Sequence, residues 1–233
     1  MPRARVRRVK PYSGYNGTTP DKLLLDAGVL FKNFHVGTDT YQSAKAAGKC
    51  LGATQKGTEF SAKPIYRRME IDGVHTRTKG DTLIDGWETY LKTTLVEMTS
   101  YTLRRALGAA DIDTETNEDY DVIKGRDTIQ DEDFEENITF IGNLLGETEP
   151  IIIQVINAFH EGGLTFSAED KNNAGVECQF YGYLNDDVYD DPEQEIEPPF
   201  AIYRPKTAAA AASNNTPSNN TQGGNSNTQG GNS

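Results

Sequence analysis

The sequence predicts a mainly β domain with one short flanking α-helix, long loops and an unstructured C-terminal tail. Three observations favour this class. Hydrophobic and polar residues alternate over 82–98, turn residues at 52–54 and 72–73 bound extended segments, and a helical period holds only briefly after Thr99. The chain has 233 residues, which is enough for one domain with a sizeable core.

Three regions are expected along the chain. Residues 1–20 have no periodicity and predict an extended basic arm, and residues 21–206 hold the β-rich domain. Residues 207–233 contain an alanine run and a Ser/Asn/Thr/Gln/Gly segment that ends in a duplicated heptapeptide. Such a segment cannot bury enough apolar area to offset the entropy of ordering, so we expect disorder there.

The first half of the domain is predicted to build strands separated by turns. We expect them over residues 28–33, 51–61, 64–71 and 82–98, with a reversal between the second and the third. The loop at 35–49 has room for a turn of helix at 41–47. In the last strand, period-two alternation places one set of side chains on a single face: Trp87, Thr89, Leu91, Thr93 and Leu95.

A short amphipathic helix follows this strand. Thr99 is a suitable N-cap, and Gly108 suits the C-terminal end of the helix. Between them Leu103, Ala106 and Leu107 recur at helical spacing. We expect about two helical turns that cover one flank of a sheet.

The second half of the domain combines acidic loops with strands. Residues 111–136 carry twelve acidic and two basic side chains, so we predict a long solvated excursion with a short strand at 120–124. Further strands are expected over residues 134–143, 150–159, 164–168, 175–184 and 200–203.

Charge is distributed unevenly along the chain. The formal net charge is −12 at pH 7, and residues 11–206 hold 18 basic against 35 acidic side chains. A body this acidic is unsuited to grip nucleic acid, because phosphate binding depends on cationic neutralisation. The N-terminal arm is positively charged, and its cations are Arg3, Arg5, Arg7, Arg8 and Lys10. They favour docking on the acidic surface of an identical neighbour over contact with nucleic acid.

Neither a membrane span nor an export signal is expected. No apolar run approaches the roughly 18 residues that a spanning helix needs, and no signal-peptide segment follows the basic N-terminus. The chain has two cysteines, Cys50 and Cys178, which is too few for a disulfide framework. Synthesis in a reducing cytoplasm is the simpler interpretation.

No catalytic, cofactor or metal site is predicted, and we do not expect an enzyme. The three histidines lie in separate segments without a second ligand type at metal spacing. The segment that starts at Asp111 begins like a calcium loop, but Thr116 and Val122 occupy the positions of its glycine and its closing glutamate. Cys178 alternates onto an apolar face, where a small buried hydrophobe is the favoured interpretation.

Several short segments over about residues 22–110 form a distinctive set: Ala27 to Asn33, Leu51 to Thr54, Gly57, Phe60, Pro64, Ile71 to Gly73, Lys79–Gly80, and Leu95 to Thr99 running into Leu103 to Gly108. Together they resemble the major tail tube proteins of long-tailed (siphophage-type) bacteriophages. The resemblance implies a β-sandwich or barrel-like fold with a flanking helix. It also implies hexameric rings stacked into a hollow tube, which carries the genome to the host cell.

Partners and location follow from the same resemblance. The partners would be further copies of the chain, the tape measure, terminator and distal tail proteins, and phage DNA that passes through the lumen without specific binding. The protein would be made in the bacterial cytoplasm and reside in the virion tail. We expect inter-subunit contacts from the basic arm and from the 35–57 loop, with these candidates: Tyr41, Lys45, Lys49 and Lys56.

An acidic lumen would keep DNA in transit, because like charge repels phosphate. Glu88 and Glu136 are the lumen candidates. Three alternatives remain open: a distal tail or baseplate ring protein, a carbohydrate-binding β-sandwich module that would use Tyr181 and Tyr183, and a hydrolase with paired carboxylates.

Overall fold

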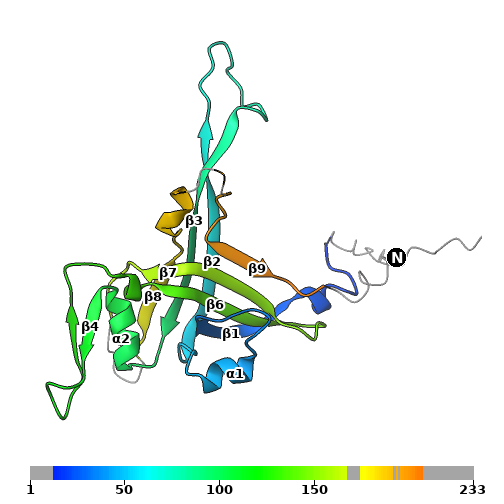
Figure 1. The fold of residues 1–233 in the computed structure, drawn as a ribbon. Helices are drawn as coiled ribbons and strands as arrows, with labels where there is room; N and C mark the ends of the chain where they lie inside the picture. The colour runs from blue at the N-terminus through cyan, green and yellow to red at the C-terminus, as the bar shows by residue number, and fades with distance from the viewer. Residues whose placement is uncertain (1–12, 167–173, 191–192, 194, 207–233) are drawn as a thin grey trace, which may run out of the picture.

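The computed structural model describes residues 13–166, 174–190, 193 and 195–206. This part of the chain is mainly β, as predicted, and contains nine strands and two α-helices (Figure 1). The strands are β1 (Leu24–Lys32), β2 (Thr54–Arg68), β3 (Thr82–Leu95), β4 (Ala110–Asp113), β5 (Val122–Gly125), β6 (Glu135–Leu144), β7 (Ile151–His160), β8 (Val176–Tyr181) and β9 (Phe200–Tyr203). The helices are α1 (Tyr41–Ala46) and α2 (Ser100–Leu107).

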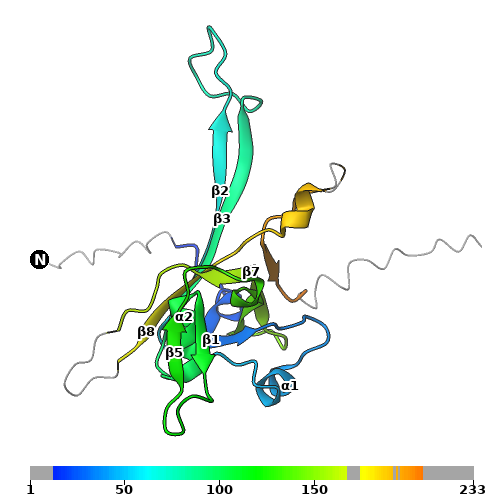
Figure 2. The ribbon, with the colours of Figure 1, turned by 60° about the vertical axis from the view of Figure 1, so that its left-hand side comes forward.

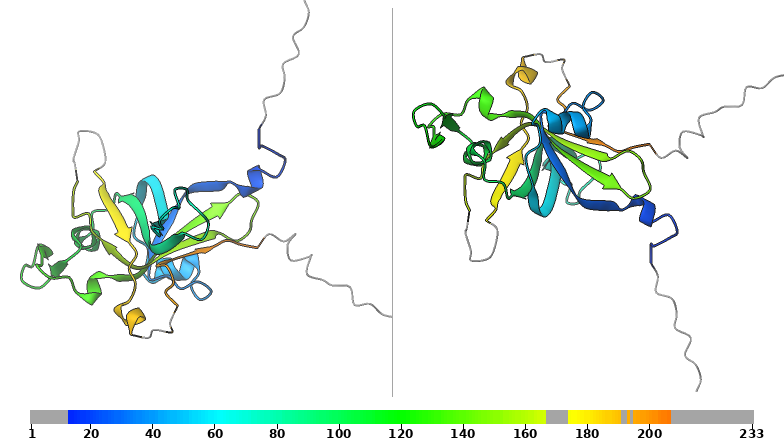
Figure 3. Two further views of the ribbon diagram at one scale, coloured as in Figure 1. Left: turned by 90° about the horizontal axis from the view of Figure 1, so that it is seen from above. Right: turned by 90° about the horizontal axis from the view of Figure 1, so that it is seen from below.

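One antiparallel sheet holds most of the strands, in the order β1-β6-β7-β8-β3-β2, with β9 also paired to β7. Strand β7 connects the two halves of this sheet. It pairs with β6 from Ile151 to Ala158 and with β9 from Ile152 to Val155, whereas its last two residues, Phe159 and His160, pair with β8. Seen from above and below, the strands β1 and β9 lie on the side of the molecule opposite to the β4–β5 hairpin (Figure 3).

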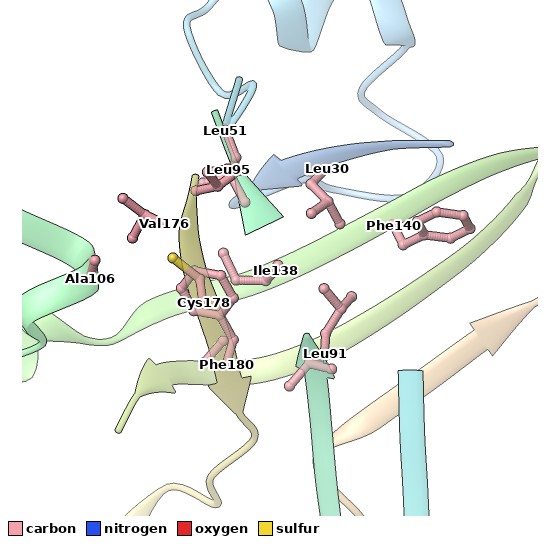
Figure 4. Close-up of a cluster of buried hydrophobic side chains, with 12 residues drawn as sticks. Leu30, Leu51, Leu91, Leu95, Ala106, Ile138, Phe140, Val176, Cys178 and Phe180 are labelled. Carbon is pink, nitrogen blue, oxygen red and sulfur yellow. The ribbon is translucent and has the colours of Figure 1, made fainter. Parts of the chain in front are cut away.

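The main core collects apolar side chains from both halves of the sheet (Figure 4). Leu30, Ile138 and Phe140 come from β1 and β6, and they meet Leu91 of β3 and Phe180 of β8. The predicted alternation in β3 is confirmed, because Thr89, Leu91, Thr93 and Leu95 are all buried and Trp87 is half-buried on the same face. A smaller cluster on the other face of β1 and β6 lies under α1.

The prediction of two strands at 51–61 and 64–71 is wrong. Residues 54–68 form one strand of 15 residues, and the chain reverses only after Arg68. Pro64 lies inside this strand opposite Trp87. A proline is tolerated there because β2 is the last strand of the sheet, so its outer side needs no ladder hydrogen bond.

Other boundaries differ by a few residues. Strand β1 begins four residues earlier than expected, at Leu24, and β3 and β8 end three residues earlier, at Leu95 and Tyr181. The strand expected at 164–168 is absent over 164–166, and its last two residues lie outside the described part of the chain. The basic residues of the arm and the whole of 207–233 also lie outside it.

Helix α2 begins and ends as its sequence predicts. The Thr99 hydroxyl accepts a hydrogen bond from the Thr102 amide at 3.1 Å. Gly108 ends the helix with φ +79°, and a Cβ atom there would lie 2.8 Å from the His160 carbonyl oxygen. A glycine is therefore required for both conformation and space. The buried face of α2 packs against β4, β5, β7 and β8.

The acidic segment after α2 is more ordered than a solvated excursion. It forms the β4–β5 hairpin, and β4 is a strand that the sequence does not predict. A buried ion cluster attaches it to α2: Arg104 Nη2 donates to Asp133 Oδ1 at 3.0 Å, and Arg126 also contacts the Asp133 carboxylate. The Asp133 side chain is fully buried. The acidic residues here are thus partly structural.

The variant Asp133→Ala is expected to lower the free energy of unfolding by about 3–5 kcal/mol, because it leaves two partly buried guanidinium groups without their shared carboxylate. Urea unfolding followed by circular dichroism measures this loss. The matched control is Asp111→Ala, since Asp111 also pairs with Arg126, at 3.2 Å, but is 62% exposed. That change is expected to cost less than about 1 kcal/mol. Equal losses in both variants would contradict the structural role of Asp133.

Candidate functional site: the projecting β2–β3 hairpin

The most prominent surface feature is a hairpin that projects from the body (Figures 1 and 2). Strands β2 and β3 pair along their whole length, from Thr54 opposite Leu95 to Arg68 opposite Thr82. Strand β8 pairs with β3 only from Tyr90 to Leu95. From Tyr90 toward the tip, the hairpin is therefore a two-stranded ribbon, with no third strand on either side among the described residues.

Large apolar side chains are exposed on this ribbon. Tyr66 and Ile84 lie opposite each other in register and are 63% and 55% exposed. Their chain neighbours Ile65 and Leu83 are exposed as well. An exposed cluster of this kind on a soluble protein usually marks an interaction site. We define these four residues, which lie on both faces of the ribbon, as the hairpin patch.

The loop at the tip is held by a buried carboxylate. Asp81 is 2% exposed, and its Oδ2 accepts hydrogen bonds from the Thr78 amide at 3.1 Å and from Arg68 Nε at 3.2 Å. Arg68 also donates to the Val74 carbonyl at 3.2 Å. The Thr78 hydrogen bond, more than the nearby guanidinium, holds the pKa of Asp81 below its ordinary value. These bonds hold the tip loop in one conformation.

The hairpin also differs in charge from the body. Residues 63–86 carry five basic and four acidic side chains, whereas 11–206 as a whole holds 18 basic against 35 acidic. Two of these charged side chains, Arg67 and Asp85, form a surface ion pair at 2.9 Å. A nearly neutral projection can approach a second acidic body without the repulsion that two such bodies would feel.

Three of the four loop candidates gather around α1. Tyr41 packs edge-on against Phe31, with ring centroids 5.8 Å apart, and the Lys45 ammonium lies 5.8 Å from the Tyr41 centroid. Lys49 donates to Asp39 at 2.6 Å and thereby lowers the Asp39 pKa. Lys56 lies elsewhere, at a bulge of β2 with φ +67°.

The two lumen candidates are exposed but are not neighbours. Glu88 lies on β3 opposite Lys63, whereas Glu136 lies on β6, with its Oε1 3.1 Å from His35 Nε2. Strands β7 and β8 separate β3 from β6 in the sheet. Whether either residue faces a lumen depends on the assembly, so that assignment stays a prediction.

The tyrosines of the carbohydrate alternative are held in contacts within the chain. Tyr181 packs on Tyr90 with centroids 5.7 Å apart and accepts a hydrogen bond from Gln179. Tyr183 packs against Phe134 and contacts Glu161, and burial raises its pKa. Neither ring is a free platform for a sugar.

No group of three or more His, Cys, Asp or Glu side chains among the described residues is placed to hold a metal ion. Cys178 is buried in the main core, as its alternation predicts, and burial raises its pKa to about 12. Among the helices that the structure describes, none has the length and apolar character to cross a membrane.

Comparison with known proteins adds no family assignment. No model of a known protein family matches the chain, and a search of curated proteins finds no match.

Sequence reasoning missed the hairpin patch. A usable signal is the pair of adjacent apolar residues in each strand, Ile65–Tyr66 and Leu83–Ile84, on either side of a turn at Asp72–Gly73. Adjacent strand residues point to opposite faces, so a strand with one buried face would not normally place apolar groups on both.

The variant Asp81→Asn is expected to loosen the tip loop, because an amide accepts the Thr78 and Arg68 hydrogen bonds more weakly than a carboxylate does. The lowered pKa means that this ordering is complete above the ordinary Asp pKa of about 3.9 and is lost as pH falls through the folded-state value. Amide hydrogen exchange at Thr78 measures it. Protection should decline in acid in the parent protein and stay low at every pH in the variant.

Asp85→Asn is the control, since Asp85 pairs with Arg67 on the outside of the same hairpin. It should leave Thr78 exchange unchanged. Parent-like protection in Asp81→Asn would show that the buried carboxylate does not order the loop.

Proposed function

We propose that this protein is a structural subunit that assembles as stacked hexameric rings into a siphophage-type tail tube, the conduit for genome delivery. The observation that carries the proposal is the hairpin patch. A preorganised ribbon that exposes Tyr66 and Ile84 would be stabilised by a partner surface, and β8 pairs with β3 no further toward the tip than Tyr90. In a polymer of identical copies the partner is always present.

The free edge of the sheet supports the same function. Strand β2 has 15 residues, lies at the end of the strand order, and has no hydrogen-bonded strand on its outer side among the described residues. Monomeric proteins usually keep edge strands short or shielded, because an open edge templates pairing with another chain. Edge pairing between neighbours in a ring would use this strand productively.

The charge of the body fits a conduit for DNA. An acidic lining repels phosphate and keeps the duplex from adhering to the wall. Glu88 and Glu136 remain our lumen candidates, and both are exposed in the isolated chain. Tape measure, terminator and distal tail proteins would be the other partners, with the virion tail as the location, and no catalysis is proposed.

A distal tail or baseplate ring is the alternative from the same kind of assembly. It would form a single ring that does not polymerise, so filament growth distinguishes the two. The carbohydrate-binding alternative is less well supported, since Tyr181 and Tyr183 are both held in contacts within the chain.

The double variant Tyr66→Thr/Ile84→Thr is expected to stay monomeric under conditions in which the parent forms rings and tubes. Full burial of each side chain contributes roughly 1.5–3 kcal/mol, so its loss should raise the critical concentration at least ~10-fold. Threonine keeps the strand propensity of the ribbon. Negative-stain microscopy and sedimentation velocity measure the outcome.

The control is Tyr120→Thr/Ile129→Thr, which removes two apolar residues of similar exposure, 73% and 58%, from the acidic segment. This variant should assemble normally. A parent protein that remains monomeric at high concentration would contradict the proposed function. Normal assembly of the hairpin variant would contradict the role of the patch.

A further inference from the structure

An apolar stripe crosses one face of the sheet at the edge formed by β1, β6, β7 and β9. Val29 pairs with Ile141, Ile141 with Ile152, and Ile152 with Tyr203. Residues directly opposite one another in register point to the same face. The next row, which includes Leu30, Phe140 and Ile153, points to the other face and packs in the main core.

Helix α1 covers only one end of this face. Ala44 of α1 packs on Phe31, Phe34 and Ile141 in the smaller cluster. The rest of the stripe is left as a groove made of two depressions of about 580 and 670 Å³, which share Tyr41, Ile141 and Pro150. We call this surface the α1 groove. It is open in the isolated chain, and Tyr41 and Tyr203 on its walls are well exposed.

The hairpin patch and the α1 groove belong to opposite ends of the molecule. In both side views the hairpin tip is at the top and α1 is at the bottom (Figures 1 and 2). A copy displaced along this direction brings its hairpin toward the α1 end of its neighbour. A contact between two different surfaces on identical chains does not close on itself, so it can repeat indefinitely.

The two surfaces are complementary in their apolar character. The groove offers apolar walls, and its rim carries both signs of charge: Asp39, Glu147 and Glu149 with Arg204 and Lys206. Two of the rim acids are paired within the chain, Asp39 with Lys49 and Glu147 with Arg204. The hairpin offers the four apolar residues of its patch, and its tip likewise carries both signs: Glu70 and Asp72 with Arg77 and Lys79. Apolar contact would supply affinity, and the mixed charges on both sides would avoid strong repulsion.

We propose that the α1 groove receives the β2–β3 hairpin of a second copy of this chain. The inference rests on the proposed self-assembly and deepens it, since it names the acceptor for the hairpin. It also gives Tyr41 a defined role as a wall of the acceptor. The N-terminal arm is the competing occupant, because it too carries basic and apolar residues.

Paired cysteines test the contact directly. The variant Ile84→Cys/Tyr203→Cys carries one thiol on the hairpin and one on the groove, and Tyr66→Cys/Tyr203→Cys is a second pair in case the first disturbs folding. Assembled protein is treated with a short bis-maleimide and separated on a denaturing gel. Head-to-tail contact predicts a ladder of dimers, trimers and longer chains, because each subunit is linked on both sides.

Matched controls define the background. Each variant with a single added cysteine should give no ladder. Because the native, half-buried Cys50 is present in these variants too, they also test whether it contributes to cross-linking. Ile84→Cys/Ile202→Cys should give none either, because Ile202 pairs with Ile153 and so points away from the groove. In a parallel assay, Tyr203→Glu should raise the critical concentration at least ~10-fold.

The outcomes separate the inference from the proposed function. A ladder specific to the groove pairs supports the contact. Tubes in which neither groove pair cross-links, or which form normally with Tyr203→Glu, overturn the groove as acceptor and leave the tube function standing; the N-terminal arm would then be the occupant to examine. Parent protein that forms no assembly overturns both.

Discussion

The outer half of the β2–β3 ribbon has no core of its own, and this constraint determines much of what the molecule can do. A two-stranded ribbon is marginal in water, yet this one exposes Tyr66 and Ile84 as a cross-strand pair. In the proposed assembly another surface covers the pair and removes the cost of that exposure. That surface would be the α1 groove of a neighbouring copy. The open edge of β2 would provide a second contact between copies.

Buried carboxylates hold the projecting parts in shape. Asp81 orders the tip loop through Thr78 and Arg68, and Asp133 attaches the β4–β5 hairpin to α2 through Arg104 and Arg126. In both places an acidic side chain that looks like surface charge in the sequence is a structural anchor. The remaining exposed acids give the body its charge, which would repel the phosphates of DNA in the proposed tube.

Local signals predicted the parts of the fold that depend on local physics. Alternation predicted the inner half of β3 because one face of it is buried, and Thr99 and Gly108 predicted both ends of α2. The break expected between residues 61 and 64 does not occur, and the tolerance of Pro64 within β2 depends on an edge position that only the sheet order defines. The hairpin patch and the α1 groove depend on tertiary pairing: Val29 and Ile141 are far apart in sequence but adjacent in register.

The most direct measurement of the central claim is a cryo-electron microscopy map of the full chain at high concentration. We predict a helical tube of stacked rings in which the β2–β3 hairpin is buried between subunits and the acidic body lines an open bore. A tube or ring in which the hairpin extends free into solvent, or particles no larger than one chain, would contradict the account.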